Sequence, residues 1–395
     1  MKVCAVSFKE CWRDADGHWC SDGGFPLQMA AIGSMFDSMD LLIVRVEPRS
    51  GGLRLPGHAN VIALPKPRGS NARRKLSVIM RAPHYLSVLK RHIRRADVVH
   101  VPLPGDIPLL AFFVALTLRK RLIARYGSSW AANSQTTWMN RFTKACLRHV
   151  AGGRNAVFVT GAEELPRPLR SIFATALSET ELNGIRADLN REISRPPRLV
   201  YVGRLSEEKG VAHLVEAIAR LRRESFDPLP EVTIVGDGPA RNRLLALVDG
   251  LACADRINFA GQLNRAGVSE HLAGADLCVQ PSLTEGFSKA WLDAMAHGVP
   301  VIASDVGAAR YAIGGDGRRG WLVPPGNVEA LTAALQRAIQ EPRQWPALRN
   351  ACRRFAQEHT LERWQTQIAH ACAEQWEMLL VKGKLRTIAC AQEFQ

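Results

Sequence analysis

In the second half of the chain, an acidic residue and a glycine lie between an apolar run and a helix-like segment. The run QPSLTEGFS contains Glu285 and then Gly286, Phe287 and Ser288, whose backbone amides would open the next helix. Helix N-termini of this kind bind anions. Asp293 follows eight residues after Glu285, among apolar residues of that helix. Because a carboxylate can accept several hydrogen bonds, the two acids predict a site for sugar hydroxyls.

Two further loops carry glycines and basic residues after apolar runs. Arg204 and Lys209 lie five apart in GRLSEEKG, and such a strand-to-helix loop can bind a pyrophosphate. The alternative is a solvated turn with surface charges. Gly236 and Gly238 belong to GDGP, where glycine lets a backbone approach a ligand. The alternative there is a tight turn with a proline at the helix start.

Apolar runs alternate with helix-length segments along both halves of the chain. The runs are Val3–Phe8, Leu41–Val46, Val98–Val101, Leu122–Tyr126 and Ala156–Thr160, then Leu199–Val202, Val232–Val235, Ile257–Phe259, Leu277–Gln280 and Val299–Ala303. This alternation is typical of parallel sheets covered by helices. We predict an α/β protein of two facing Rossmann-like doubly wound domains, with an interdomain cleft at the carboxyl ends of the strands.

The predicted domain boundaries follow from where the alternation stops. We expect an N-terminal domain over 1–185, a linker over 186–197 that closes at Pro196-Pro197, and a C-terminal domain over 198–363. Residues 364–395 begin with apolar residues at spacings of three and four, so we expect a C-terminal helix that packs back on the N-terminal domain.

Composition and charge narrow the class of protein. The 395 residues are 47% hydrophobic and 23% charged, which is typical of globular domains. No transmembrane run and no signal peptide is visible, so we expect a cytoplasmic protein. Nine widely spaced cysteines without a CxxC pair favour reduced thiols over disulfides or a zinc site. The whole excess of the net charge of +15 lies in residues 1–200, which hold 30 Lys/Arg and 15 Asp/Glu. An anionic partner of the first half is therefore expected.

The run from Leu199 to Pro325 resembles the donor-binding domain of glycosyltransferase family 4, which has the GT-B fold. The likeness rests on GRLSEEKG, GDGP, PSLTEGF and DAMAHGVPVIASDVG, in that order. The resemblance implies a hexosyltransferase-type enzyme that moves a sugar from a nucleotide-diphosphate sugar to a glycan or lipid-linked acceptor. It also implies retention of anomeric configuration, no metal and no cofactor beyond the co-substrate. Cell-surface polysaccharide, lipopolysaccharide or glycolipid synthesis would be the setting.

The resemblance assigns roles in the second half. Arg204 and Lys209 would hold the diphosphate and offset charge on the leaving group, which makes them catalytic together with Glu285 at the donor sugar. Asp293 stands where the family usually has a glutamate that binds the nucleotide ribose. The shorter side chain puts its reach and the nucleotide preference in question.

The first half departs from the family pattern. Gly23 and Gly24 stand where related enzymes bring a Gly-Gly loop to the donor phosphate. His100, Arg125 and Ser129 lie near positions that face the cleft in relatives, so they are candidates for the acceptor side or the cleft. A strand-end histidine that fills space is the alternative for His100.

A basic stretch over 66–95 holds ten Lys/Arg and no acid. Within it Tyr85, Leu86, Leu89 and Ile93 recur at helical spacings. A basic amphipathic helix could lie on the anionic inner face of a membrane. The alternative is an ordinary helix with its apolar stripe on the sheet.

Other functions stay open at this point. The same fold serves glycan synthases, sugar phosphorylases and nucleotide-sugar epimerases, although no lysine site for pyridoxal phosphate can be identified. The pI near 9.8 suggests nucleic-acid binding. Against it, the chain has no RNA-binding aromatic motif, zinc finger or helix-turn-helix pattern, so we expect no nucleic-acid partner.

Overall fold

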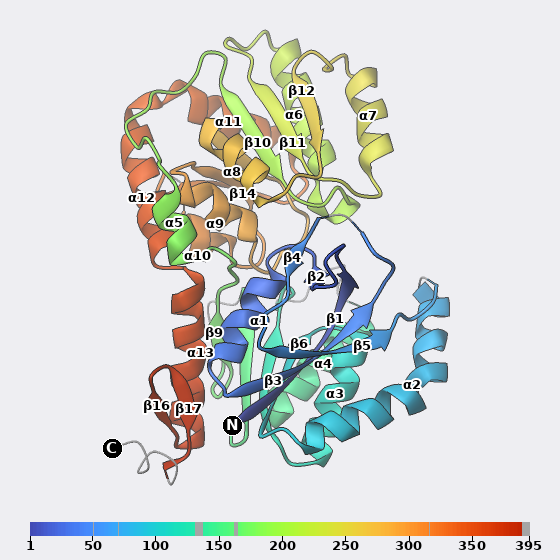
Figure 1. Ribbon diagram of the computed structural model, residues 1–395. Helices are drawn as coiled ribbons and strands as arrows, with labels where there is room; N and C mark the ends of the chain where they lie inside the picture. Colours follow the sequence, from blue (N-terminus) through green and yellow to red (C-terminus); the bar gives the residue numbers. More distant parts are fainter. Residues whose placement is uncertain (50, 70, 131–136, 162–164, 316, 389–395) are drawn as a thin grey trace. The chain divides into compact units, whose positions relative to one another are not determined.

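A computed structural model describes residues 1–49, 51–69, 71–130, 137–161, 165–315 and 317–388. The chain divides into two compact units. Figure 1 shows their helices and strands, coloured by position in the sequence. The first consists of residues 1–176 together with the chain from Leu361, and the second of Leu177–Thr360. The unit boundaries therefore differ from the expected ones at 185 and 363. The segment 186–197, expected as a linker, belongs to the second unit.

The first unit is built on a nine-stranded sheet. Its parallel strands have the order β5-β3-β1-β6-β7-β8-β9, and β2 and β4 extend the sheet antiparallel beside β1. The strands are β1 (Lys2–Arg13), β2 (Trp19–Ser21), β3 (Ser38–Arg45), β4 (Leu53–Arg54), β5 (Ala59–Pro65), β6 (Val98–Leu103), β7 (Arg121–Tyr126), β8 (Asn155–Thr160) and β9 (Arg170–Ile172). The order reverses between β1 and β6, as it does in doubly wound sheets.

Alternate residues of these strands face two different helix layers, because successive side chains of a strand point to opposite faces. Val3 and Ala5 of β1 pack with α1 (Phe25–Ser34) and α13 (Leu361–Trp376). Cys4 and Val6 pack on the other face with α2 (Asn71–Arg94), α3 (Asp106–Thr117) and α4 (Trp138–Val150).

The helix α2 presents its sequence-predicted apolar stripe to this sheet. Tyr85, Leu89 and Ile93 are fully buried in the core, and Leu86 packs against it. These residues therefore follow the ordinary-helix alternative, and the prediction that their stripe faces a membrane is wrong.

The end of the chain completes the first unit. In α13, Trp364, Ile368 and Cys372 are fully buried among residues of the N-terminal sheet. A hairpin of β16 (Leu379–Val381) and β17 (Lys384–Arg386) follows. Among the described residues no helix combines the length and apolarity that a membrane crossing requires. The eight cysteines in this part of the chain are all free thiols; Cys390 lies outside it.

The second unit has a six-stranded, wholly parallel sheet of order β12-β11-β10-β13-β14-β15. Its strands are β10 (Arg198–Val202), β11 (Glu231–Val235), β12 (Ile257–Gly261), β13 (Leu277–Gln280), β14 (Val301–Ser304) and β15 (Gly320–Val323). Its helices are α5 (Glu179–Gly184), the 3₁₀ turn η1 (Glu207–Lys209), α6 (Val211–Arg223), α7 (Arg241–Gly250), α8 (Arg265–Gly274), α9 (Lys289–Ala296), α10 (Ala309–Ile313), α11 (Val328–Gln340), η2 (Pro342–Gln344) and α12 (Trp345–Gln357). Numbered from β10, the strand order is 3-2-1-4-5-6, and it reverses between β10 and β13.

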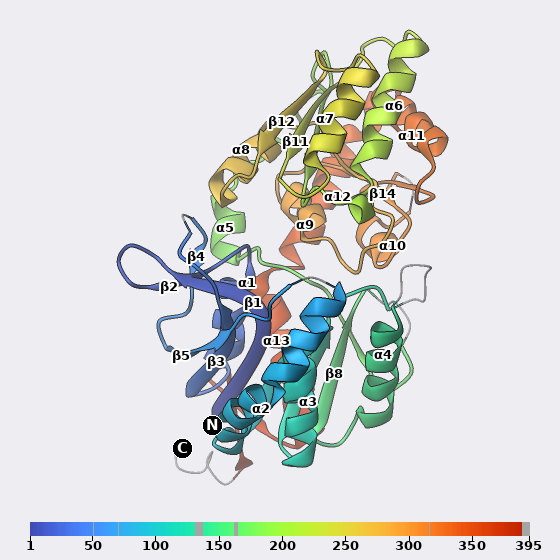
Figure 2. The ribbon, with the colours of Figure 1, turned by 90° about the vertical axis from the view of Figure 1, so that its right-hand side faces the viewer.

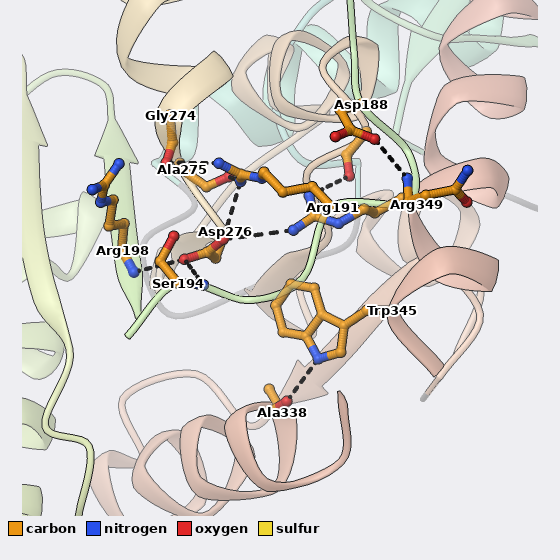
Figure 3. Close-up of polar contacts among 12 residues, drawn as sticks. Asp188, Arg191, Ser194, Arg198, Gly274, Ala275, Asp276, Ala338, Trp345 and Arg349 are labelled. Carbon is orange, nitrogen blue, oxygen red and sulfur yellow. Dashed lines mark hydrogen bonds and ion pairs between the residues drawn. The ribbon is translucent and has the colours of Figure 1, made fainter. Parts of the chain in front are cut away.

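A buried carboxylate explains why segment 186–197 belongs to the second unit (Figure 3). Asp276, at the start of β13, has no exposed side-chain surface and pairs with Arg191 at 3.0 Å and with Arg349 at 3.6 Å. It also accepts hydrogen bonds from the backbone amides of Ser194 and Arg198 at 3.1 and 2.9 Å. A buried charge requires such partners, so the segment is held against the sheet.

Candidate functional site

The carboxyl ends of β10 and β13 meet where the strand order of the second unit reverses. The Gln280 Nε2 donates to the Val202 carbonyl at 2.9 Å and ties the two strand ends together. Beyond them, the Leu283 amide donates to the Glu208 carbonyl at 2.8 Å. Gly210 has a left-handed φ of 64°, and a Cβ there would lie 2.0 Å from the Pro281 carbonyl oxygen. The loops after β10 and β13 are thus packed backbone to backbone at the position where doubly wound sheets bind ligands.

Lys209 and Glu285 face each other across these two loops and form an ion pair between Nζ and Oε2. Both side chains remain partly exposed, with 24% and 15% of their surface accessible. The second Glu285 oxygen accepts from the Gly286 amide at 3.2 Å. The structure therefore brings together two of the three predicted catalytic residues.

Arg204, the third predicted catalytic residue, is exposed on the loop after β10. Within the described ranges its guanidinium forms no ion pair. Its carbonyl accepts from the Tyr201 hydroxyl at 3.0 Å, which fixes the backbone of the loop. The side chain is therefore available to an anion at this edge of the sheet.

The loop after β14 packs against the backbone of Glu285 and Gly286. A Cβ on Gly307 would lie 2.2 Å from the Glu285 carbonyl oxygen, and the Ala308 amide donates to the Gly286 carbonyl at 2.8 Å. The ring of Phe287 is buried and packs on Trp291 at a centroid distance of 5.7 Å.

Ser288 is the N-cap of α9, and its side chain accepts no hydrogen bond from that helix. Of the three predicted amides, those of Gly286 and Phe287 precede the helix and that of Ser288 belongs to its N-cap residue. All three lie at the N-terminal end of α9, which favours negative charge.

Gly236 and Gly238 serve a packing role in the structure. A Cβ on Gly236 would lie 1.9 Å from the Gly203 carbonyl oxygen, and one on Gly238 would lie 2.2 Å from the Leu205 carbonyl oxygen. The absent side chains let the loop after β11 pack against the loop after β10. The glycines thereby support the loop that carries Arg204 and Lys209.

Asp293 is part of a charge cluster that sequence reasoning missed. Its carboxylate lies 3.5 Å from Arg265 Nη2, and the Arg265 Nε donates to Glu181 on α5. Burial raises the pKa of Asp293, Glu181 raises it further, and the Arg265 charge opposes both. No motif flags Arg265 or Glu181, because the three residues lie on separate elements, α8, α5 and α9.

The candidates of the first unit fall into two groups. Gly23 has a left-handed φ of 62°, and Gly24 is the N-cap of α1. Ser129 follows β7 and is partly exposed. These three lie beyond the carboxyl ends of strands, the edge where ligands of such sheets bind.

His100 and Arg125 are instead core residues. His100 is fully buried, and Arg125 donates from Nε to its Nε2 at 2.9 Å. The Arg125 guanidinium stacks on the ring of Trp364 at 4.7 Å. Burial and the Arg125 charge hold the pKa of His100 well below its usual value, and burial lowers the pKa of Arg125 to about 10. Both side chains are buried, so His100 follows the space-filling alternative and the expectation that Arg125 lines a cleft is corrected.

Metal-ligating side chains gather at one place in the described residues, on the loop between β1 and β2. Asp14, Asp16 and His18 lie there with their ligand atoms within 4.8 Å of one another. Arg54 pairs with Asp14 at 3.1 Å and with Asp16 at 2.6 Å, so one guanidinium charge already offsets part of the negative charge of the two carboxylates.

A family model matches part of the second unit. Residues 196–341 match the family described as glycosyl transferases group 1. The MMP alpha-(1->4)-mannosyltransferase of Mycolicibacterium hassiacum is 37% identical over 183 residues, which are 46% of this chain and 42% of that protein. The D-inositol 3-phosphate glycosyltransferase of Jonesia denitrificans is 33% identical over 174 residues, 42% of this chain and 41% of that protein. The chain thus matches less than half the length of these curated relatives.

Comparisons of structure extend over nearly the whole chain. Sucrose-phosphate synthase from Thermosynechococcus elongatus superposes with a TM-score of 0.71 at 21% identity, over 95% of this chain and 99% of that one. The Anabaena protein HepE in complex with UDP gives a TM-score of 0.67 at 17% identity, over 95% and 100% of the two chains. WaaG, a glycosyltransferase involved in lipopolysaccharide biosynthesis, gives 0.64 at 18% identity, over 93% and 98%. The predicted GT-B fold class is confirmed by this likeness.

Proposed function

We propose, from the premise that residues 196–341 are a group 1 glycosyltransferase domain, that this chain transfers a sugar from a nucleoside-diphosphate sugar to a glycan or lipid-linked acceptor. The observation that carries the proposal is the Lys209–Glu285 pair at the reversal point of the second sheet. An ammonium and a carboxylate are placed there side by side, next to the backbone amides that open α9. A phosphate group and a polyhydroxylated sugar require these two kinds of partner.

The donor diphosphate would bind to Arg204 and Lys209. Arg204 is exposed on the same loop that carries Lys209, and it can form two parallel hydrogen bonds to phosphate oxygens. When the bond to the sugar breaks, negative charge develops on the β-phosphate. Two fixed cations beside that phosphate stabilise the charge more in the transition state than in the ground state. In other enzymes a divalent metal ion stabilises this charge on the phosphate. Because Arg204 and Lys209 can do the same, we propose metal-independent transfer.

Glu285 would hold the donor sugar. In the structure its Oε2 pairs with Lys209 and its Oε1 accepts from the Gly286 amide. Once Lys209 binds the diphosphate, the carboxylate can accept hydrogen bonds from sugar hydroxyls instead. We propose that the sugar is transferred with retention of configuration, and that Asp293 accepts hydrogen bonds from the nucleotide ribose.

The glycan or lipid-linked acceptor, and a role in cell-surface polysaccharide, lipopolysaccharide or glycolipid synthesis, are part of the same proposal. Support comes from the basic first half, which suits an anionic acceptor. Gly23, Gly24 and Ser129, at the carboxyl ends of the first sheet, are the residues we assign to that side.

The direct test is a panel of nucleoside-diphosphate sugars. Binding of a donor raises the apparent melting temperature by mass action, and binding donors are then incubated with candidate acceptors in buffer with EDTA. We expect one donor class to stabilise the protein and to yield a glycosylated acceptor whose anomeric configuration NMR determines. A donor that is epimerised with no acceptor present would show an epimerase instead. Failure of every donor to bind would contradict the proposal.

A further inference from the structure

The helix α2 carries a second apolar stripe, separate from the one that packs on the sheet. Leu76, Ile79 and Met80 are 59%, 67% and 75% exposed. They recur at spacings of three and four, so they share one side of the helix. At about 100° per residue, this side lies roughly opposite to the buried side of Tyr85, Leu89 and Ile93. Large apolar side chains so exposed, and in a row, indicate a binding surface.

Neighbouring helices extend this stripe. Trp138, in the first turn of α4, is 64% exposed, and the Lys75 ammonium of α2 lies 5.5 Å from the centre of its ring. One turn further along α4, the exposed ring of Phe142 lies 6.3 Å from the exposed ring of Phe113 on α3. Figure 2 shows α2, α3 and α4 side by side on one face of the first unit. We call these six residues, Leu76, Ile79, Met80, Phe113, Trp138 and Phe142, the α2–α4 surface.

The charges around the α2–α4 surface are almost all positive. Arg73, Lys75 and Arg141 are exposed on α2 and α4. Between residues 71 and 150 the sequence has only two acids, Asp97 and Asp106. Arg74 pairs with Asp106 at 3.1 Å, which neutralises the acid on these helices. The surface therefore combines exposed aliphatic and aromatic groups with uncompensated positive charge.

We propose that the α2–α4 surface docks on an anionic lipid bilayer. Aliphatic side chains enter the acyl boundary, the indole of Trp138 suits the headgroup region, and the basic residues meet lipid phosphates. A second copy of the chain fits less well, because two such basic surfaces would repel each other. Nucleic acid would bind the basic residues through its phosphates, and Leu76, Ile79 and Met80 would then have no apolar partner. The proposal concerns the first unit and does not depend on the proposed transfer reaction.

The test is co-sedimentation of the full chain with vesicles of phosphatidylcholine alone, or of phosphatidylcholine and phosphatidylglycerol in equal parts. We expect binding to the anionic vesicles only. The triple variant Ile79→Ser, Met80→Ser, Trp138→Ser should lower the partition coefficient by roughly tenfold or more, because two aliphatic contacts with the acyl boundary and the indole in the headgroup region are lost. Lys75→Glu with Arg141→Glu should lower it by a similar factor at low salt. Leu379→Ser is the matched control, since Leu379 is also an exposed apolar residue, on β16.

Circular dichroism and the melting temperature check that each variant is folded, as expected for changes at exposed positions. Two results would overturn the proposal. One is a wild-type protein that stays in solution with anionic vesicles. The other is a triple variant that binds them as tightly as the Leu379→Ser control, since retention would then be purely electrostatic. A concentration-dependent dimer that the triple variant abolishes, with no vesicle binding, would assign the surface to a second copy instead.

Discussion

Lys209 and Glu285 are 76 residues apart in the chain, and the Nζ of one contacts the Oε2 of the other at the carboxyl edge of the second sheet. The contact joins the loops after β10 and β13, the two strands between which the strand order reverses. A cation and an anion held together in this way neutralise each other. Under the proposed function, a diphosphate that binds the lysine would free the carboxylate to accept hydrogen bonds from the sugar.

We predict that Lys209→Ala and Glu285→Gln each lower kcat/KM for transfer by roughly 10² to 10³, because each removes a charged partner of the donor. Initial rates at varied donor concentration measure the effect. Glu224→Gln is the control, since Glu224 forms an exposed pair with Arg220 on the outer helix α6. Near-normal turnover in either site variant, with a normal melting temperature, would show that the pair is only structural.

Arg265 should control nucleotide affinity through Asp293. Without the guanidinium, Asp293 would lie near Glu181 with less opposing positive charge, and its pKa, already raised by burial, should rise further. A protonated Asp293 accepts ribose hydrogen bonds poorly, so Arg265→Gln should weaken binding of a nucleoside diphosphate more at pH 6 than at pH 8.

Calorimetric titration with UDP at both pH values would measure this, with Arg265→Lys as the conservative variant that restores part of the affinity. Lys289 and His297 also lie near Asp293, and both are unchanged in this comparison. Arg222→Gln, which breaks an exposed pair with Asp255, is the matched control. An equal loss of affinity at both pH values would indicate that Arg265 only supports the fold.

His100 should make the first unit sensitive to acid. Its folded-state pKa lies below the unfolded value of about 6.5, so the unfolded chain binds the proton first as the pH falls. Titration of His100 therefore leaves the free energy of unfolding unchanged well above pH 6.5 and decreases it as the pH falls below that value. Between pH 7.5 and 5.5 the decrease is about 1.4 kcal/mol.

The variant His100→Gln keeps a hydrogen-bond acceptor for Arg125 and cannot take up the proton. We expect it to be less stable than the wild type at pH 7.5 and to lose less stability on going to pH 5.5. Urea unfolding followed at both pH values gives the comparison. An identical pH dependence of the two proteins would rule out His100 as the responsible group.

Gly236→Ala should destabilise the second unit by more than about 2 kcal/mol. The new Cβ would lie 1.9 Å from the Gly203 carbonyl oxygen, and φ at this position is 140°, where alanine is strained. Gly250→Ala is the control, because no atom lies within 4 Å of its ideal Cβ. If Gly236→Ala folds as stably as the wild type but loses donor binding, the glycine serves ligand approach alone.

The fold class, and the loops that carry the candidate residues of the second unit, could be predicted from the sequence alone. Apolar runs separated by helix-length segments indicate parallel strands with crossover helices, and the loops after such strands must meet at one edge of the sheet. Glu285, Lys209 and Gly286, which precedes α9, all lie in those loops. Each of them follows shortly after an apolar run, so a local sequence pattern is enough to name it as a candidate.

Tertiary structure decided the features that depend on contacts between distant segments. Arg125 ends in the core because Trp364 of α13, more than 200 residues later, stacks on its guanidinium, and Arg125 in turn donates to the buried His100. The Arg265 cluster joins three elements that no sequence window contains. On α2 two apolar stripes are equally visible as periodicities, and only packing against the sheet shows that Tyr85, Leu89 and Ile93 are buried while Leu76, Ile79 and Met80 are exposed. Periodicity says that a helix has an apolar side; burial depends on what the rest of the chain places against it.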